Sequence, residues 1–369
     1  MRPLTVVQLL PALESGGVER STLEIADALV RAGHRAIVVS AGGRLVPALE
    51  ASGAEHVALD IGRKSPLSLR QVPALRRLFA QASVDIVHAR SRVPAWLARF
   101  ALRGGAGPHF VTTVHGLNSP SRYSAVMASG ERVVCVSETV RAHVLRHYPQ
   151  TDPAKLRVIP RGIDPEAFPR APLPDRAARA EAAAMHPALG GDGPLLLMPG
   201  RGTRLKGHAD ALALLARLRA DGSDARLWMP GALDPARARY VAELEAMARV
   251  LGIADALAIT APTAAMPRAY AASDLVLQLS RKPEAFGRTV LEAVASGRAV
   301  AGWDHGGVGE QLAQWWPQGA VPTFDEAALA ANVAAQLARR AAPAVTMPDT
   351  LRAMQEATLS LYAELAGQR

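Results

Sequence analysis

The sequence is short of cysteine, with a single one, Cys135, among 369 residues. One thiol cannot form an intramolecular disulfide, which excludes the disulfide-dense secreted scaffolds and fits a reducing compartment. Cys135 lies in the apolar run RVVCVSE, so we expect a buried strand residue and not a reactive thiol.

Long hydrophobic runs are also missing. No stretch reaches the ~18 uncharged apolar residues that span a bilayer, so we expect no integral membrane segment. The start, MRPLTVVQLLPAL, has one charge before a short apolar run, and Glu14 and Glu19 follow soon after. This pattern predicts a first β-strand instead of a signal peptide, and hence a cytoplasmic protein.

Several motifs of binding chemistry are absent. The first strand–helix turn has neither G-x-G-x-x-G nor G-x-x-x-x-G-K-[ST], which leaves dinucleotide and P-loop proteins without their signature. No D-x-D motif and no His/Cys cluster at metal spacing occurs, so we expect no catalytic metal and no cofactor. Aromatic residues make up only 4%, so stacking platforms for nucleic acid are scarce, and we expect no nucleic-acid partner.

Acidic residues are scarce in the first half. Residues 1–165 hold 21 Lys and Arg against 12 Asp and Glu, whereas the remaining residues hold 21 of each, so the net charge of +9 belongs to the first half. Such an asymmetry indicates that this half faces something anionic.

What is present is a repeated order of apolar strands and amphipathic helices. Residues 4–10 read as a buried strand, 18–33 as a helix and 34–41 as the next strand; residues 194–200, 208–222 and 225–231 repeat that order. Strands that are apolar throughout and alternate with helices predict parallel sheets covered on both faces.

The sequence therefore predicts an α/β chain of two Rossmann-like, doubly wound domains that face each other across a ligand cleft. A stretch rich in proline and charge, residues 160–194, marks the linker region. We expect the domains at 1–168 and 169–349, with a carboxyl-terminal helix at 350–369 that joins the first domain.

Two acids stand close together in RKPEAFGRTVLEAVASG. Glu284 lies in a loop after strand 274–280, and Glu292 lies in a helix predicted from about Arg288 to Ser296. Between them, the backbone N–H groups of Phe286 and Gly287 are exposed at the helix start, where phosphate or sugar oxygens can bind. Paired carboxylates suit vicinal hydroxyls. The structural alternatives are a first-turn acid for Glu284 and a partly buried acid paired to an arginine for Glu292.

Two other turns carry binding potential. Gly16 and Gly17 lie between the first strand and helix, where the backbone can approach an anion, although a plain tight turn explains them about as well. Arg201 and Lys206 lie in the corresponding turn of the second half, PGRGTRLKGH, and could neutralise a diphosphate. Their alternative is a solvated surface loop.

E-A-F-G-R-T-V-L-E resembles the E-x7-E signature of retaining glycosyltransferases with the GT-B fold, in particular glycosyltransferase family 4 of the bacterial lipopolysaccharide and cell-envelope type. The supporting motifs occur in order along most of the chain: the glycine pair, TVHG at 113–116, VSETV at 136–140, IPRGID at 159–164, GR-x4-KG at 200–207, YAASD at 270–274 and EAVASGRAV at 292–300. IPRGID departs from the pattern, since Arg161 stands where the family more often has asparagine. APT at 261–263 replaces the more usual T-G, which puts the base in doubt.

The resemblance implies a nucleotide-sugar enzyme that retains the anomeric configuration without a protein nucleophile. It assigns the ribose hydroxyls to Glu292, the transferred sugar to Glu284 and the backbone of Phe286 and Gly287, and the diphosphate to Arg201 and Lys206. The other implied donor contacts are Gly16, Gly17, His115, Arg288 and Thr289. Without the resemblance, His115 reads equally well as a hydrogen-bonded strand-end histidine.

The implied partners are a nucleotide-sugar donor and a saccharide or lipid-linked acceptor. Segments 66–82 and 88–100 are basic and amphipathic, which suggests peripheral contact with the anionic cytoplasmic face of the inner membrane, although ordinary crossover helices with wet arginines also explain them. Two other functions remain open at this point, a nucleotide-sugar 2-epimerase of the same fold and a basic nucleic-acid-binding protein.

Overall fold

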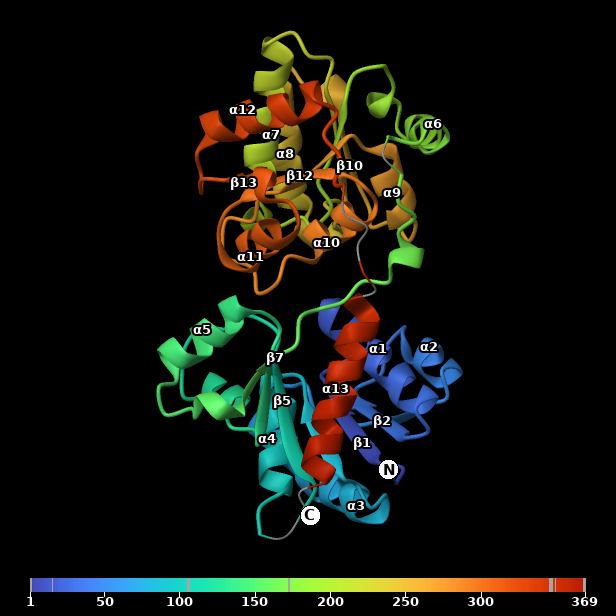
Figure 1. Ribbon diagram of the computed structural model, residues 1–369, viewed down its shortest axis with the longest axis vertical. Coiled ribbons are helices and arrows are strands. Elements are labelled where there is room, and N and C mark those ends of the chain that lie inside the picture. Colours follow the sequence, from blue (N-terminus) through green and yellow to red (C-terminus); the bar gives the residue numbers. More distant parts are fainter. Residues whose placement is uncertain are drawn as a thin grey trace. The chain divides into compact units, whose positions relative to one another are not determined.

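The computed structural model describes residues 2–14, 16–104, 107–171, 173–344, 348 and 350–367. They form two compact units, Met1–Gly162 with Leu351–Arg369, and Ile163–Thr350 (Figure 1). The sequence-based boundary at residue 168 therefore falls inside the second unit. The short 3-10 helix Pro165–Ala167 belongs to that unit.

The first unit is built on a parallel sheet with the strand order β3-β2-β1-β4-β5-β6-β7. Its strands are β1 (Thr5–Leu9), β2 (Arg35–Ser40), β3 (Glu55–Ala58), β4 (Ile86–Ala89), β5 (His109–Val114), β6 (Arg132–Cys135) and β7 (Leu156–Val158). Its α-helices are α1 (Gly17–Arg31), α2 (Val46–Ala51), α3 (Val72–Gln81), α4 (Arg92–Ala101), α5 (Glu138–His147) and α13 (Thr350–Ala366). Because β1, β4 and β5 are buried along almost their whole length, helices must cover both faces of the sheet.

Helix α13 returns from the far end of the chain to complete this unit, and Figure 1 shows it beside α1. Tyr362 and Leu365 of α13 join Ile25 and Leu29 of α1 in one hydrophobic core over the sheet. Gln355 donates to the Glu24 carbonyl oxygen at 2.9 Å, which ties the two helices together. Residues 368 and 369, which the sequence analysis assigned to this helix, lie outside the described residues.

The second unit contains a parallel sheet with the strand order β10-β9-β8-β11-β12-β13. Its strands are β8 (Leu195–Leu197), β9 (Arg226–Pro230), β10 (Leu257–Thr260), β11 (Leu275–Gln278), β12 (Ala299–Trp303) and β13 (Ala320–Val321). Its helices are α6 (Arg176–Met185), α7 (His208–Ala220), α8 (Ala238–Val250), α9 (Met266–Ala272), α10 (Arg288–Ala295), α11 (Gly306–Trp315) and α12 (Glu326–Ala338).

Part of the predicted linker is a helix of this unit, which corrects the sequence interpretation of residues 160–194. Helix α6 begins because the Asp175 carboxylate accepts hydrogen bonds from the N–H groups of Ala177 and Ala178. Arg268 of α9 pairs with Glu181 of α6 at 2.6 Å and holds the helix in place. The prolines on both sides of α6 are typical of a linker, so the sequence did not predict this short alanine-rich helix.

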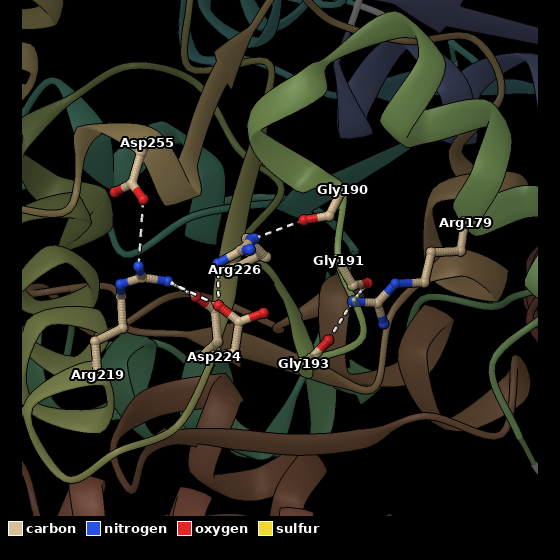
Figure 2. Close-up of polar contacts among 9 residues, drawn as sticks. Arg179, Gly190, Gly191, Gly193, Arg219, Asp224, Arg226 and Asp255 are labelled. Carbon is tan, nitrogen blue, oxygen red and sulfur yellow. Dashed lines mark hydrogen bonds and ion pairs between the residues drawn. The ribbon is translucent and has the colours of Figure 1, made fainter.

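At the amino edge of the second sheet, arginines donate hydrogen bonds to the glycine-rich loop that precedes β8 (Figure 2). Arg226 donates to the Gly190 carbonyl oxygen at 2.7 Å, and Arg179 donates to the Gly191 carbonyl oxygen at 3.4 Å. Arg226 and Arg219 also pair with Asp224, at 2.6 and 3.4 Å. These positive charges are therefore used to hold structure at this edge.

Both units match the doubly wound pattern, so the predicted α/β class with two Rossmann-like domains is confirmed. Cys135 is confirmed as a buried residue of β6, and burial raises the pKa of its thiol to about 12. Within the described ranges, no helix is both long and apolar enough to cross a membrane.

Candidate active site

The carboxyl edge of the second sheet carries most of the predicted site. The loop after β8 leads through the 3-10 helix Arg204–Lys206 into α7, and the loop after β11 leads into α10. Arg281 donates its backbone N–H to the Leu205 carbonyl oxygen at 2.8 Å, which joins the two loops. Gly207 lies between them at φ 79°, where a Cβ atom would stand 2.0 Å from the Leu279 carbonyl oxygen, so only glycine fits.

This junction brings Lys206 and Glu284 together. The Lys206 ammonium nitrogen lies 2.5 Å from Glu284 Oε1, and the Ser280 hydroxyl donates to the same oxygen. Burial alone would raise the pKa of Glu284, but the charge and hydrogen bond of Lys206 and the bond from Ser280 hold that pKa below its ordinary value. Glu284 is therefore ionised at neutral pH.

Two helix starts converge on the loop that holds Glu284. Gly287 caps α10 at φ 92°, and the backbone N–H of Gly307, in the first turn of α11, donates to the Glu284 carbonyl oxygen at 2.7 Å. A Cβ atom on Gly307 would stand 2.5 Å from the Phe286 nitrogen, so α11 can approach the loop only because residue 307 is glycine. Helix starts favour anions and hydroxyl oxygens, and two of them lie against the loop that holds Glu284.

Glu292 lies in α10 and has two neighbours that restrain its carboxylate. Tyr270 of α9 donates to Oε2 at 2.8 Å, and Arg288 donates to Oε1 at 3.2 Å. Burial, with the nearby Glu292 charge, raises the pKa of Tyr270 well above its usual range, so the phenol stays a donor. The structural alternative for Glu292, an acid paired to an arginine, is thus present in the molecule. A carboxylate has about four acceptor positions, which suits it to accepting hydrogen bonds from hydroxyl groups.

The other second-unit candidates are placed as follows. Thr289 and Arg288 form the first turn of α10, and both side chains are half-buried. Arg201 has an exposed side chain, and within the described part of the chain its guanidinium makes no ion pair. The structure therefore brings Lys206, Glu284 and α10 together and leaves Arg201 facing solvent.

The first unit places His115 at the carboxyl end of β5. Arg161 donates to His115 Nδ1, so the ring proton must be on Nε2. Nε2 is buried and has no hydrogen-bond partner among the described residues. Burial, followed by the charges of Arg161 and Arg90, lowers the pKa of His115 well below its usual range. His115 is thus a neutral donor whose N–H is unused.

Gly16 and Gly17 lie at the start of α1, and both are exposed. Gly16 caps the helix at φ 149°, and a Cβ atom on it would stand 2.6 Å from Glu19 Oε2. A Cβ atom on Gly17 would meet nothing within 4 Å. The helix start is therefore open, and only Gly16 is required by the backbone.

Sequence reasoning missed a buried cation in the first unit. Arg90 follows β4 directly, is 4% exposed, and donates to Gln8 Oε1 at 2.8 Å and Ser21 Oγ at 3.1 Å. His88 lies 2.5 Å from the Tyr362 hydroxyl and 2.6 Å from Thr113 Oγ1. The position of Arg90 directly after a buried strand could have indicated a buried cation, but the sequence of segment 88–100 predicted a basic surface helix.

In the second unit, the missed residues are Tyr270, Ser280 and His305. His305 Nε2 lies 2.8 Å from the Ser280 carbonyl oxygen and so supports the residue that contacts Glu284. Tyr270 opens the YAASD motif, to which the sequence alone gives no role. All three lie at ends of strands or helices, and only the folded chain brings them to the two glutamates.

Comparisons with known proteins show which families and folds the chain matches. The family model of Glycosyltransferase Family 4 matches residues 15–167, and that of Glycosyl transferases group 1 matches residues 184–353. A search of curated protein sequences finds no significant match.

Solved structures resemble the chain along almost its full length. A glycosyltransferase from Rickettsia africae aligns with a TM-score of 0.84 at 27% identity, over 99% of each chain. HepE of Anabaena, solved with UDP and glucose, aligns with a TM-score of 0.80 at 18% identity, over 98% of this chain and 100% of that one. WaaG, a glycosyltransferase involved in lipopolysaccharide biosynthesis, aligns with a TM-score of 0.68 at 18% identity, over 98% and 94%. The chain thus consists of a glycosyltransferase family 4 domain followed by a glycosyl transferases group 1 domain, and it is a glycosyltransferase of the GT-B fold.

Proposed function

We propose that this protein is a retaining glycosyltransferase that moves a sugar from a nucleoside-diphosphate sugar to a saccharide or lipid-linked acceptor, in the synthesis of lipopolysaccharide or another cell-envelope glycan. The observation that carries the proposal is the Lys206–Glu284 pair, at 2.5 Å, on a loop against which two helices begin. It offers a cation, an acceptor of hydroxyl hydrogen bonds and backbone donors within one small site. HepE, solved with UDP and glucose, and WaaG, involved in lipopolysaccharide biosynthesis, have the same fold.

The donor contacts follow from the two glutamates. We propose that the Glu292 carboxylate accepts hydrogen bonds from the ribose hydroxyls while Tyr270 and Arg288 hold it in position. Glu284, with the backbone of Phe286 and Gly287, takes hydroxyls of the transferred sugar. The diphosphate lies against Lys206, the exposed Arg201, and Arg288 and Thr289 in the first turn of α10.

The chemical step needs a stabilised leaving group. The bond between the anomeric carbon and the diphosphate oxygen breaks, and its electron pair goes to that oxygen. The acceptor hydroxyl oxygen bonds to the anomeric carbon on the same face, and its proton passes to the leaving phosphate oxygen. Lys206 and Arg201 stabilise the negative charge that develops there, which is the electrostatic contribution this reaction needs most. We propose that these cations serve where other transferases use a metal.

The first unit supplies further contacts. We propose that the unused Nε2–H of neutral His115 donates to a hydroxyl of the transferred sugar and that the open helix start at Gly16 and Gly17 takes diphosphate oxygens. Arg161 fixes the His115 tautomer, which gives a physical role to the residue that departs from the family pattern.

Membrane contact by the first unit is also part of the proposal, with one change. The apolar stripe of α3 packs inward, since Leu75 and Phe79 are buried, and Arg76 donates to the carbonyl oxygens of Phe100 and Ala101 at 3.0 and 3.2 Å. Arg70 and Arg77 remain exposed and can face anionic lipid. Helix α3 is therefore an ordinary crossover helix whose apolar side packs on the protein. The proposed membrane contact is made by the exposed arginines, Arg70 and Arg77.

The test is release of nucleoside diphosphate across a panel of nucleotide sugars without acceptor, together with thermal shift by UDP, GDP and ADP. We expect one base to be preferred, with loss of both signals in Glu292→Ala and retention in the matched control Glu245→Ala, an exposed helical glutamate of the same unit. An inverted anomeric centre in the product would contradict the retaining mechanism. A recovered sugar altered at C2 would identify an epimerase, and stabilisation by a short oligonucleotide alone would identify a nucleic-acid-binding protein.

A further inference from the structure

An open groove runs along α4 in the first unit and has no assigned role. It has a volume of about 660 Å3 and lies between α4 and the 3-10 helix Pro66–Gln71. Its floor and walls are mostly apolar, with Trp96 and Phe100 of α4, Leu69 of the 3-10 helix and Tyr123. This volume is within the ~300–1,000 Å3 typical of small-molecule pockets. We call this hollow the α4 groove.

The surroundings of the α4 groove are strongly cationic. From Asp60 to Arg103 the chain carries nine Lys and Arg residues and two acids, Asp60 and Asp85. Asp85 is 7% exposed and is bound by Arg2 at 2.5 Å, whereas Asp60 pairs with Arg63 at 2.5 Å, so the nine cations exceed the two acids by seven and the surface stays positive. Arg63, Lys64 and Arg92 line the groove. The occupant must therefore combine an apolar body with negative charge.

Each aromatic ring of the groove already has an arginine or another ring against it. Trp96 and Phe100 stack on each other with centroids 5.7 Å apart, and Arg99 and Arg103 lie 5.9 and 4.7 Å from these same rings. The Arg92 guanidinium lies 5.3 Å from the Tyr123 ring centroid. Bases and sugars bind aromatic residues through ring faces, whereas a hydrocarbon chain needs only apolar surface.

The rim of the groove presents apolar side chains to solvent. Leu67 is 62% exposed and Leu69 is 49% exposed, on a turn held by a hydrogen bond from Ser68 Oγ to the Arg63 carbonyl oxygen at 2.7 Å. Large apolar side chains among cations are typical of protein surfaces that dip into the membrane interface. A second copy of this chain would bring the same excess of positive charge and would be repelled.

We propose that the α4 groove takes one hydrocarbon chain of an anionic membrane glycerophospholipid, while the head group meets Arg63, Lys64 and Arg92. Each methylene that enters strengthens association about fourfold, and a chain combined with a basic surface gives stable anchoring where either signal alone is weak. The inference rests on the proposed function in one respect: anchoring would bring the enzyme to a lipid-linked acceptor. It assigns a lipid site to residues that contact neither donor nor sugar.

The test uses the position of the tryptophans. Trp96 is the one tryptophan among residues 1–162; the others are Trp228, Trp303, Trp315 and Trp316. Vesicles of phosphatidylglycerol with brominated acyl chains quench tryptophans that contact lipid chains. We expect quenching in the full-length protein, its loss in Trp96→Phe, and none with unbrominated vesicles or with soluble glycerol phosphate.

A groove variant separates chain binding from charge. Leu69→Glu is expected to abolish quenching, whereas Val250→Glu, at a position 87% exposed in the second unit, leaves it unchanged. Co-sedimentation with phosphatidylglycerol without quenching of Trp96, or a shift of Trp96 emission by a lipid-free oligosaccharide or an oligonucleotide, would overturn the proposal. Donor hydrolysis is measured on the same samples without lipid, and we expect Leu69→Glu to leave it unchanged. Absence of donor hydrolysis in the unmodified protein would count against the proposed function and not against the lipid site.

Discussion

At the scale of single residues, the second-unit site consists of two restrained carboxylates. Glu284 is held by Lys206 and Ser280, and Glu292 is held by Tyr270 and Arg288. A carboxylate whose orientation is fixed before binding loses less side-chain entropy when a hydroxyl arrives. We therefore expect the supporting residues to contribute to affinity for the proposed donor.

Tyr270→Phe tests this restraint. Loss of the 2.8 Å bond to Glu292 Oε2 leaves that oxygen without its buried donor, and bonds to charged groups contribute about 1.5–3 kcal/mol. We expect the KM for the nucleotide sugar to rise about tenfold or more, with a much smaller change in kcat. Tyr240→Phe is the control, since its hydroxyl lies 3.5 Å from His208 and makes a weaker contact. Unchanged KM in Tyr270→Phe would count against a positioning role.

The Lys206–Glu284 pair allows a double-mutant cycle. Lys206→Ala removes both the proposed diphosphate contact and a cation that lowers the pKa of Glu284, so we expect kcat/KM for donor hydrolysis to fall about 10²–10³-fold. Glu284→Gln should then add little to Lys206→Ala, with a coupling energy of about 1–3 kcal/mol. Strictly additive losses would mean that the two side chains act separately.

At the scale of elements, the site depends on how closely α10 and α11 start beside each other. Gly287 has a φ of 92°, and the Cβ atom added by Gly287→Ala would stand 3.1 Å from Val308 Cα. Gly222 has a similar φ of 88°, but the Cβ atom added by Gly222→Ala would have no neighbour within 4 Å. We expect Gly222→Ala to cost about 1–2 kcal/mol in free energy of unfolding, from the backbone alone. Gly287→Ala should cost more and should also weaken stabilisation by nucleoside diphosphate. Equal losses in denaturant titrations would show that the contact with α11 is unimportant.

Element types were largely predictable, and their partners were not. Strand β8 is a short apolar run, and β1 is apolar apart from Thr5 and Gln8, so the sequence predicted buried parallel strands. Helix α6 was hidden because prolines on both sides resemble a linker. The contact between Lys206 and Glu284 joins residues 78 positions apart, and no local pattern encodes that distance. The sequence shows that Arg161 departs from the family pattern, but its contact with His115 appears only in the folded unit.

At the scale of the whole molecule, several histidines are buried as neutral groups. Burial lowers the pKa of His208 to about 4 and holds those of His88 and His115 well below the usual range. Between these values and about 6.5 the unfolded chain binds more protons than the native chain, so stability falls as pH falls through that window.

We therefore expect the free energy of unfolding to decrease from pH 7 to pH 5, where most carboxylates stay ionised in both states. His208 alone should account for about 3 kcal/mol by pH 4. Urea titrations at several pH values measure the slope. The slope should become smaller in His208→Gln and stay unchanged in His147→Gln, because His147 is exposed. A profile flat down to pH 5 would contradict the buried neutral state.

Helix α13 has one more consequence, for synthesis on the ribosome. The first unit is interrupted by the second, and Tyr362 and Leu365 enter its core only after Ile163–Thr350 has been translated. Because domains fold as units while the chain emerges, the second unit can reach its native state before the first is complete. During this interval of translation the apolar surface around Ile25 and Leu29 lacks the cover of α13, so the nascent first unit exposes part of its core until the end of the chain has been made.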